Sequence, residues 1–165
     1  MTDDVPSAQP SDPVDVQEVE DANRAMYAAI ENGDLDAMAA LWIGDDEGDP
    51  SVCVHPGWAP VLGRARILRS WALVMAGTPY IQFFLTDVRT RVLGDVAVVS
   101  CAENILTAVG STGGVPADPS EGFAGGQVVA TNVFRRTDGG WRAVVHHASP
   151  VLARAEDDVP DEDAR

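Results

Sequence analysis

The sequence contains no lysine, because all eleven of its basic residues are arginines. This absence excludes enzymes that form a Schiff base on a lysine amine. Only two cysteines are present, Cys53 and Cys101, and both lie in apolar stretches, so we expect buried free thiols and no disulfide framework. A zinc site of Cys53, His55 and His147 would lack a close ligand pair such as C-x-x-C, and we expect no metal.

The sequence also lacks a basic stripe, a Gly-rich phosphate loop and any apolar run near the roughly 20 residues of a membrane span. We therefore expect no nucleic-acid partner, no membrane insertion and no cofactor. The N-terminus is acidic and has no apolar signal segment, so the protein is expected to be cytoplasmic.

Acidic residues dominate the charge, and they concentrate at the two ends of the chain. The formal net charge is −15; residues 1–21 carry seven acids and no base, and residues 154–165 carry six acids and two arginines. Such Pro-rich, acidic segments bury too little apolar surface to offset the entropy of ordering. The sequence predicts disordered tails at 1–13 and 154–165, with one domain at 14–153 between them.

Helical spacing of apolar residues predicts three helices in the first half of the chain, at 15–31, 34–43 and 63–77. Asp12 or Asp15 can cap the first helix and Asp34 the second. Gly33 suits the left-handed position that ends the first helix.

Strand signals fill the second half of the chain. A short strand at 51–56 precedes four longer ones at 80–94, 96–109, 127–137 and 141–151, and a Gly/Pro-rich loop at 110–126 is long enough to form a lid. Consecutive strands of this kind form an antiparallel meander, with one face free to pack helices. The expected fold is α+β, with a curved sheet that leaves a cavity beneath the helices.

The segments "NGDLDAMAALW", "VHPGW…GR" and "FRRTDGGWRAVVHHASP" resemble the nuclear-transport-factor-2-like superfamily, and most of all its SnoaL-like branch. The resemblance covers about residues 14–152. It implies a cone-shaped, mostly antiparallel sheet wrapped around a long N-terminal helix, with two further helices and a central pocket. It also implies a homodimer, because members commonly pair through the outer face of the sheet.

Ketosteroid isomerase belongs to this superfamily, and the resemblance lets its catalytic positions be compared with this chain. The isomerase's carboxylate base falls on His55, and its second oxyanion donor falls on Asn132. Its tyrosine donor falls on Met26, whereas Tyr27 is one residue off and so about 100° away around the helix. One donor is thus lost and the other weakened, so steroid isomerisation by the familiar mechanism is not expected.

Neighbouring residues of a strand point to opposite faces, so only one of His146 and His147 can face the pocket. When the resemblance is extended along the last three strands, it predicts which residues face the pocket and which face away from it. The residues expected to face inward are Ser100, Ala102, Asn104, Ala130, Asn132, Phe134, Trp141, Ala143, Val145 and His147. The residues expected to face outward are Cys101, Glu103, Arg142, Val144 and His146.

The expected site is an apolar pocket for a small molecule, with a few polar groups. Its candidate catalytic residues are His55, Asn132 and His147, and its candidate lining residues are Met26, Trp58, Trp71, Asn104 and Phe134. Structural roles remain open: His55 can belong to a surface turn, His147 can bind a backbone carbonyl, Asn132 can satisfy a buried backbone group, and the tryptophans can simply pack.

Two functions follow from this reading. The first is an isomerase, cyclase or dehydratase in which His55 is the base, because an ordinary histidine has a pKa near working pH. The second is a non-catalytic, dimeric ligand-binding or association module, because the final hairpin also resembles the association domain of calmodulin-dependent kinase. A small apolar ligand is the expected partner in both, and the sequence alone leaves open whether the protein is an enzyme.

Overall fold

The computed structural model describes residues 12–44, 48, 50–108 and 123–151, with the side chains of residues 123 and 124 excepted. Residues 1–11 and 154–165 of the two expected tails, and most of the loop expected at 110–126, lie outside the described residues. The tail expected at 1–13 was placed two residues too far along the chain, because Asp12 caps the first helix and Pro13 begins it.

Three helices form where the apolar spacing predicts them. Helix α1 spans Pro13–Glu31, and Asp12 caps it by accepting a hydrogen bond from the Val14 amide at 2.9 Å. Gly33 follows at a φ of 63°, a left-handed conformation that glycine adopts without strain. It turns the chain into helix α2, Leu35–Leu41.

Asp34 caps helix α2 by accepting a hydrogen bond from the Ala37 amide at 2.8 Å. Helix α3 spans Arg64–Gly77. In the described part of the chain, no helix is both long enough and apolar enough to cross a membrane.

Six strands form one curved sheet in the order β2-β1-β6-β5-β4-β3. Their bounds are Val52–Val54 (β1), Val61–Leu62 (β2), Ile81–Leu93 (β3), Val96–Ala108 (β4), Phe123–Thr137 (β5) and Gly140–Pro150 (β6). All neighbours pair antiparallel except β1 and β6, which run parallel. The α+β class and the curved, mostly antiparallel sheet are confirmed; the two-residue strand β2 was not expected.

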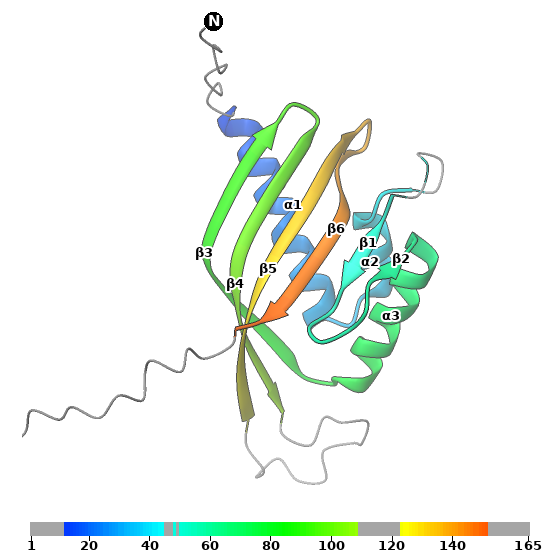
Figure 1. Cartoon of the computed structure of the whole chain (residues 1–165), viewed down its shortest axis with the longest axis vertical. Coiled ribbons are helices and arrows are strands. Elements are labelled where there is room, and N and C mark those ends of the chain that lie inside the picture. Colours follow the sequence, from blue (N-terminus) through cyan, green and yellow to red (C-terminus); the bar gives the residue numbers. More distant parts are fainter. Residues whose placement is uncertain (1–11, 45–47, 49, 109–122, 152–165) are drawn as a thin grey trace, which may run out of the picture.

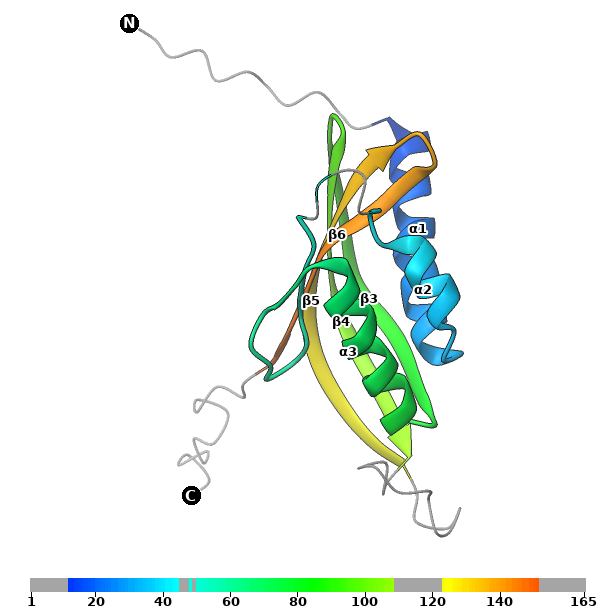
Figure 2. The same cartoon turned by 90° about the vertical axis from the view of Figure 1, so that its right-hand side faces the viewer.

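The long strands run side by side, and α1 crosses behind them (Figure 1). Seen from the side, all three helices lie on one face of the sheet, toward which the strands curve (Figure 2). The hydrophobic core fills the space between these two layers. Its largest fully buried apolar side chains are Trp42, Phe134, Met26, Met38, Ile43 and Ile67.

A β-bulge in β6 decides which histidine faces the core. Val133 pairs with Val145 but the next residue, Phe134, pairs with Ala143, so one residue of β6 is left over between the pairs. An extra residue shifts the alternation by one position. Trp141 and Ala143 therefore face inward as expected, but beyond the bulge the inward residues are His146 and Ala148. The expectation that Val145 and His147 face inward was wrong.

The inward face of β4 was also assigned one residue out of register. Directly paired residues of an antiparallel pair point to the same face, and buried Asn132 pairs with Val99. The inward residues of β4 are therefore Ala97, Val99, Cys101 and Glu103, all of them buried. The expected set, Ser100, Ala102 and Asn104, lies on the outer face.

Candidate functional site

A cavity of about 310 Å³ opens between α1, α3 and the concave face of the sheet. Most of its wall is apolar or aromatic, and four of its polar groups are buried: Tyr27, His55, Glu103 and His146. Among the described residues no arginine lines it, so that part of the wall offers no cation to a negative charge inside. An apolar chamber with a few convergent polar groups is the usual form of a small-molecule site.

A buried hydrogen-bond chain crosses the floor of this cavity from β6 to β4. The ring Nδ1 of His146 lies 2.7 Å from Oδ1 of Asn132. The Asn132 amide nitrogen donates to Asn23 Oδ1 at 2.8 Å and to the Tyr27 hydroxyl at 3.1 Å. Tyr27 in turn donates to Glu103 Oε1 at 2.7 Å. The chain links α1 to three strands through residues that are each at most 3 % exposed.

The chain fixes the tautomer of His146. Because the Asn132 amide nitrogen donates twice, its other atom, Oδ1, is the acceptor, and Nδ1 of His146 must carry the proton. The neutral ring then has its free lone pair on Nε2. Burial, helped by the charges of His55 and His147, lowers the pKa of His146 to about 3, so the ring stays neutral across the physiological range.

His55 is held in the opposite tautomer. The Ser70 hydroxyl gives its single hydrogen to the Ile67 carbonyl at 2.7 Å, so it can only accept from Nε2 of His55 at 2.8 Å. The lone pair of the neutral ring is therefore on Nδ1. Burial lowers the pKa of His55 below its usual value, which favours this neutral form.

Two tryptophans enclose the His55 ring. Trp71 and Trp58 stand edge-on to it, with ring centroids 4.6 Å and 4.9 Å away. Trp71 is buried, and its indole nitrogen has no hydrogen-bond partner among the described residues. Trp58 is 47 % exposed, which places it at the mouth of the cavity.

Among the described lining residues, Glu103 carries the one carboxyl group, and it is 2 % exposed. Burial raises its pKa, and the hydrogen bond from Tyr27 offsets only part of that effect. The pKa of Tyr27 is also raised, first by burial and then by the charge of Glu103. Tyr27 therefore remains a neutral donor, and Glu103 favours its protonated form more than an exposed glutamate would.

The structure separates the predicted site residues into three groups. His55, Trp58 and Trp71 line the cavity. Asn132 lies beneath the wall and acts through His146 and Tyr27. The others lie elsewhere: Met26 and Phe134 in the hydrophobic core, Asn104 and His147 on the outer face of the sheet.

On that outer face, His147 contacts Ser149, whereas Asn104 donates to the Phe84 carbonyl and to Thr86. The placement of His147, Asn104, Met26 and Phe134 in the pocket was therefore wrong. Sequence reasoning missed Glu103 and His146, which the one-residue errors in β4 and β6 had turned outward.

Tyr27 was the residue set aside in favour of Met26, yet it is Tyr27 that lines the cavity, with its hydroxyl bound to Glu103. The residue type itself favoured Tyr27 over Met26, because tyrosine combines an apolar ring with a polar hydroxyl that needs a partner when buried.

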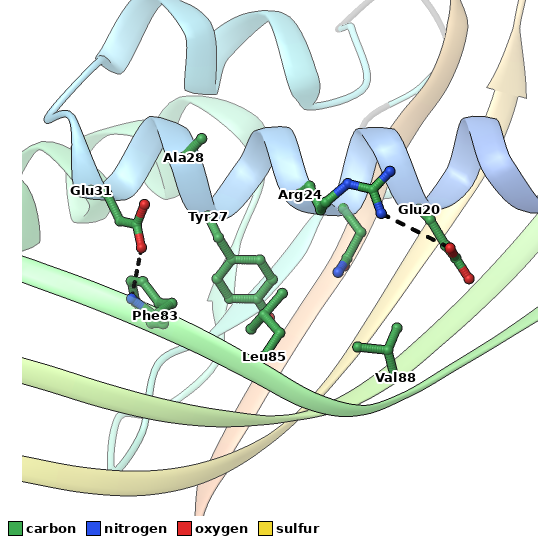
Figure 3. Close-up of a pocket in the computed structure, with 9 residues that line it drawn as sticks. Glu20, Arg24, Tyr27, Ala28, Glu31, Phe83, Leu85 and Val88 are labelled. Carbon is green, nitrogen blue, oxygen red and sulfur yellow. Dashed lines mark hydrogen bonds and ion pairs between the residues drawn. The ribbon is translucent and has the colours of Figure 1, made fainter.

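A second, larger cleft of about 650 Å³ lies between α1 and β3 (Figure 3). Its carboxylates are already engaged: Glu31 accepts from the Phe83 amide at 2.7 Å, and Glu20 accepts from Thr90 at 3.1 Å. Tyr27 and Phe83, with ring centroids 5.1 Å apart, line both hollows and separate them. Despite its smaller size, the inner cavity is the better candidate, because the buried histidines and Glu103 face it.

No group of three histidine, cysteine or acidic side chains that could hold a metal ion occurs in the described part of the chain.

The model of the SnoaL-like domain family matches residues 19–153. A solved structure of a putative dehydratase of the NTF2-like family from Streptomyces avermitilis is 50% identical, with a TM-score of 0.78; the match covers 87% of this chain and 100% of that one. A putative calcium/calmodulin-dependent protein kinase type II association domain from Thiobacillus denitrificans is 32% identical, with a TM-score of 0.65, covering 81% of this chain and 94% of that one.

Among curated proteins, the F-box protein SKIP8 of Arabidopsis thaliana is 28% identical over 130 residues. The match covers 79% of this chain and 48% of that protein, so the chain spans about half the length of this relative.

Proposed function

We propose that this chain, which belongs to the SnoaL-like domain family, uses its inner cavity for acid–base catalysis on a small apolar carbonyl compound. Isomerisation, cyclisation and dehydration all begin with the removal of a proton beside a carbonyl group. The observation that carries the proposal is His55: its Nε2–H is bound to Ser70, so its Nδ1 lone pair is the basic atom of a neutral ring on an apolar wall.

In this proposal His55 removes a proton from the carbon next to the carbonyl, and a hydrogen-bond donor stabilises the oxyanion that forms. The indole N–H of Trp71 lies beside His55 and has no partner among the described residues, but its nitrogen is itself buried in the wall. Trp71 therefore encloses the His55 ring and is not assigned as the donor. The apolar wall strengthens the hydrogen bond that the oxyanion accepts, because little water competes for it.

A test needs a ketone but no knowledge of the natural substrate. We would incubate the protein with 4-phenylbutan-2-one in D₂O and follow exchange of the protons beside the carbonyl by mass spectrometry. We expect the wild type to accelerate the exchange and His55→Gln to lose about a hundredfold of that rate. His147→Gln is the matched control, because His147 lies on the outer face of the sheet, and it should exchange at the wild-type rate. Equal rates for wild type and His55→Gln would refute the role of His55.

A second candidate is a homodimeric association module. It is supported by the 32% identity to a putative kinase association domain and by exposed apolar side chains on the outer face of the sheet, among them Phe84 at 53 % and Val129 at 48 %. Exposed apolar surface of this kind is typical of a protein–protein interface. Light scattering during size exclusion should give twice the chain mass, and Val129→Asp should shift it toward one chain mass. A wild-type monomer would contradict this candidate.

A further inference from the structure

We propose that Glu103 is the general acid of the inner cavity and that the reaction it serves is the loss of water from a β-hydroxy carbonyl compound. This inference rests on the acid–base function proposed above, and it adds a second catalytic group and a substrate class to it.

The first argument is the position of the carboxyl group. A glutamate is almost never fully buried without a charged partner, because an isolated carboxylate is costly to remove from water. Glu103 is 2 % exposed, yet the described residues of its cavity wall include no arginine, and its hydrogen-bond donor is the neutral Tyr27 hydroxyl. A carboxyl group in these surroundings keeps its proton more readily than an exposed one. The direction of its pKa shift, upward through burial, agrees with this.

The second argument is the direction of the hydrogen bonds. The Tyr27 hydroxyl accepts from Asn132 and donates to Oε1 of Glu103. Because Oε1 is the acceptor, the proton of a neutral Glu103 sits on Oε2, for which the described residues supply no partner. Tyr27 is therefore a positioning residue: it fixes one carboxyl oxygen and leaves the acidic O–H for a ligand in the cavity.

The third argument is the pairing of two opposite functions on one wall. His55 presents a basic nitrogen and Glu103 an acidic O–H in the same cavity. An isomerase can return the abstracted proton with a single base, but the loss of water needs a proton acceptor for the C–H and a proton donor for the departing hydroxyl. His55 as a base and Glu103 as an acid therefore suit the loss of water, which needs both.

The step balances without a cofactor. Nδ1 of His55 takes the proton from the carbon beside the carbonyl, the C–H electron pair passes to the carbonyl oxygen to give the enolate, and collapse of the enolate forms the new C=C bond. The C–O bond on the next carbon breaks, and its electron pair leaves with the hydroxyl, which takes the proton of Glu103 and departs as water. His55 is then protonated and Glu103 ionised, and transfer of one proton between them restores the starting state.

The experiment uses two probes that differ only in the leaving group, 4-hydroxy-4-phenylbutan-2-one and its acetate ester. Both give the same conjugated enone, which is followed by its ultraviolet absorbance. Hydroxide needs a proton to leave, whereas acetate does not. We therefore expect Glu103→Gln to dehydrate the alcohol at least about a hundredfold more slowly than wild type, and to eliminate acetate at close to the wild-type rate.

Three controls make the outcome decisive. Glu18→Gln, an exposed site on α1, should match the wild type with both probes. Tyr27→Phe, which removes the positioning hydroxyl, should slow the alcohol more than the ester. His55→Gln should slow both probes equally.

An equal loss on both probes in Glu103→Gln would mean a merely structural role and would overturn the inference, as would no loss on either probe. A wild type that exchanges protons of 4-phenylbutan-2-one but eliminates neither leaving group would overturn this inference alone. A wild type inactive in all three assays would overturn the proposed function as well.

Discussion

Oδ1 of Asn132 lies 2.7 Å from Nδ1 of His146, and the two residues face each other directly across β5 and β6. The Asn132 amide nitrogen donates to Asn23 and to Tyr27, so its Oδ1 accepts from His146, and Tyr27 in turn donates to Glu103. The position of the contact between Asn132 and His146 depends on the bulge at one residue of β6, because without the bulge the residue opposite Asn132 would be a different one.

We expect Asn132→Ala to lower the free energy of unfolding by about 3 kcal/mol, because it leaves buried polar groups of His146, Asn23 and Tyr27 without their partner. Urea unfolding measures the change. The control is Thr131→Ala, at the exposed neighbouring position on the other face of β5, which should stay within about 0.5 kcal/mol of wild type. A small effect of Asn132→Ala would mean that the network contributes little to stability.

The buried histidine should make the protein sensitive to acid. The pKa of His146 is about 3 in the folded state and near 6.5 in the unfolded chain, so the unfolded state binds more protons between those values. Stability contributed by the neutral ring is complete above pH 6.5 and is lost as the pH falls toward 3. The loss amounts to a few kcal/mol, because each pKa unit is worth about 1.4 kcal/mol.

The variants that isolate this effect are neighbours in sequence. His146→Gln should flatten the fall in unfolding free energy between pH 6.5 and 4, measured by urea titration at several pH values. His147→Gln, on the outer face, should leave the slope nearly as it is in wild type. Equal slopes for His146→Gln and wild type would contradict a buried neutral His146.

The family and the fold could be predicted from the sequence, because they depend on features that repeat along the chain. Helical spacing before residue 78 and alternating strands after it locate the elements to within a few residues. The helix ends could be predicted from single residues: Asp12 and Asp34 cap the helices that follow them, and Gly33 takes the left-handed conformation after α1.

The inward faces of β4 and β6 could not be predicted, since both depend on register. Around Val99 both faces of β4 are apolar, so the pattern does not say which face is buried. The sequence around Val144 carries no glycine to mark the bulge. A carboxyl group such as that of Glu103 is ordinarily assigned to the solvent side. The two residues that sequence reasoning missed, Glu103 and His146, are therefore those that depart from the usual rules, one by burying a carboxyl group and the other by following a bulge.

Histidine labelling tests the bulge directly. With diethyl pyrocarbonate, we expect His147 to be modified first and His146 and His55 to be protected, because the latter two are only 3 % and 4 % exposed. Peptide mass spectrometry resolves the sites, and the urea-unfolded protein should label all three. Deletion of Val144 should preserve the protection of His146, because regular alternation from Ala143 then again points residue 146 inward. Protection of His147 in the wild type would mean that β6 has no bulge.

Replacing the proposed acid should stabilise the protein at high pH. The pKa of Glu103 is raised above 4.5 in the folded state, so the folded protein binds more protons than the unfolded chain as the pH rises from that value. The stability contributed by protonated Glu103 is therefore fully present below pH 4.5 and is lost as the pH rises through the folded pKa.

Glutamine has no such titration but keeps an oxygen that can accept from Tyr27. We expect Glu103→Gln to gain about 1 kcal/mol over wild type at pH 8, as active-site replacements often do, and to gain less at pH 5. Thermal unfolding at both pH values measures the difference. Glu18→Gln, on the exposed surface of α1, should show no such pH-dependent gain, and a Glu103→Gln variant less stable than wild type at pH 8 would mean that the carboxylate is stabilised where it lies.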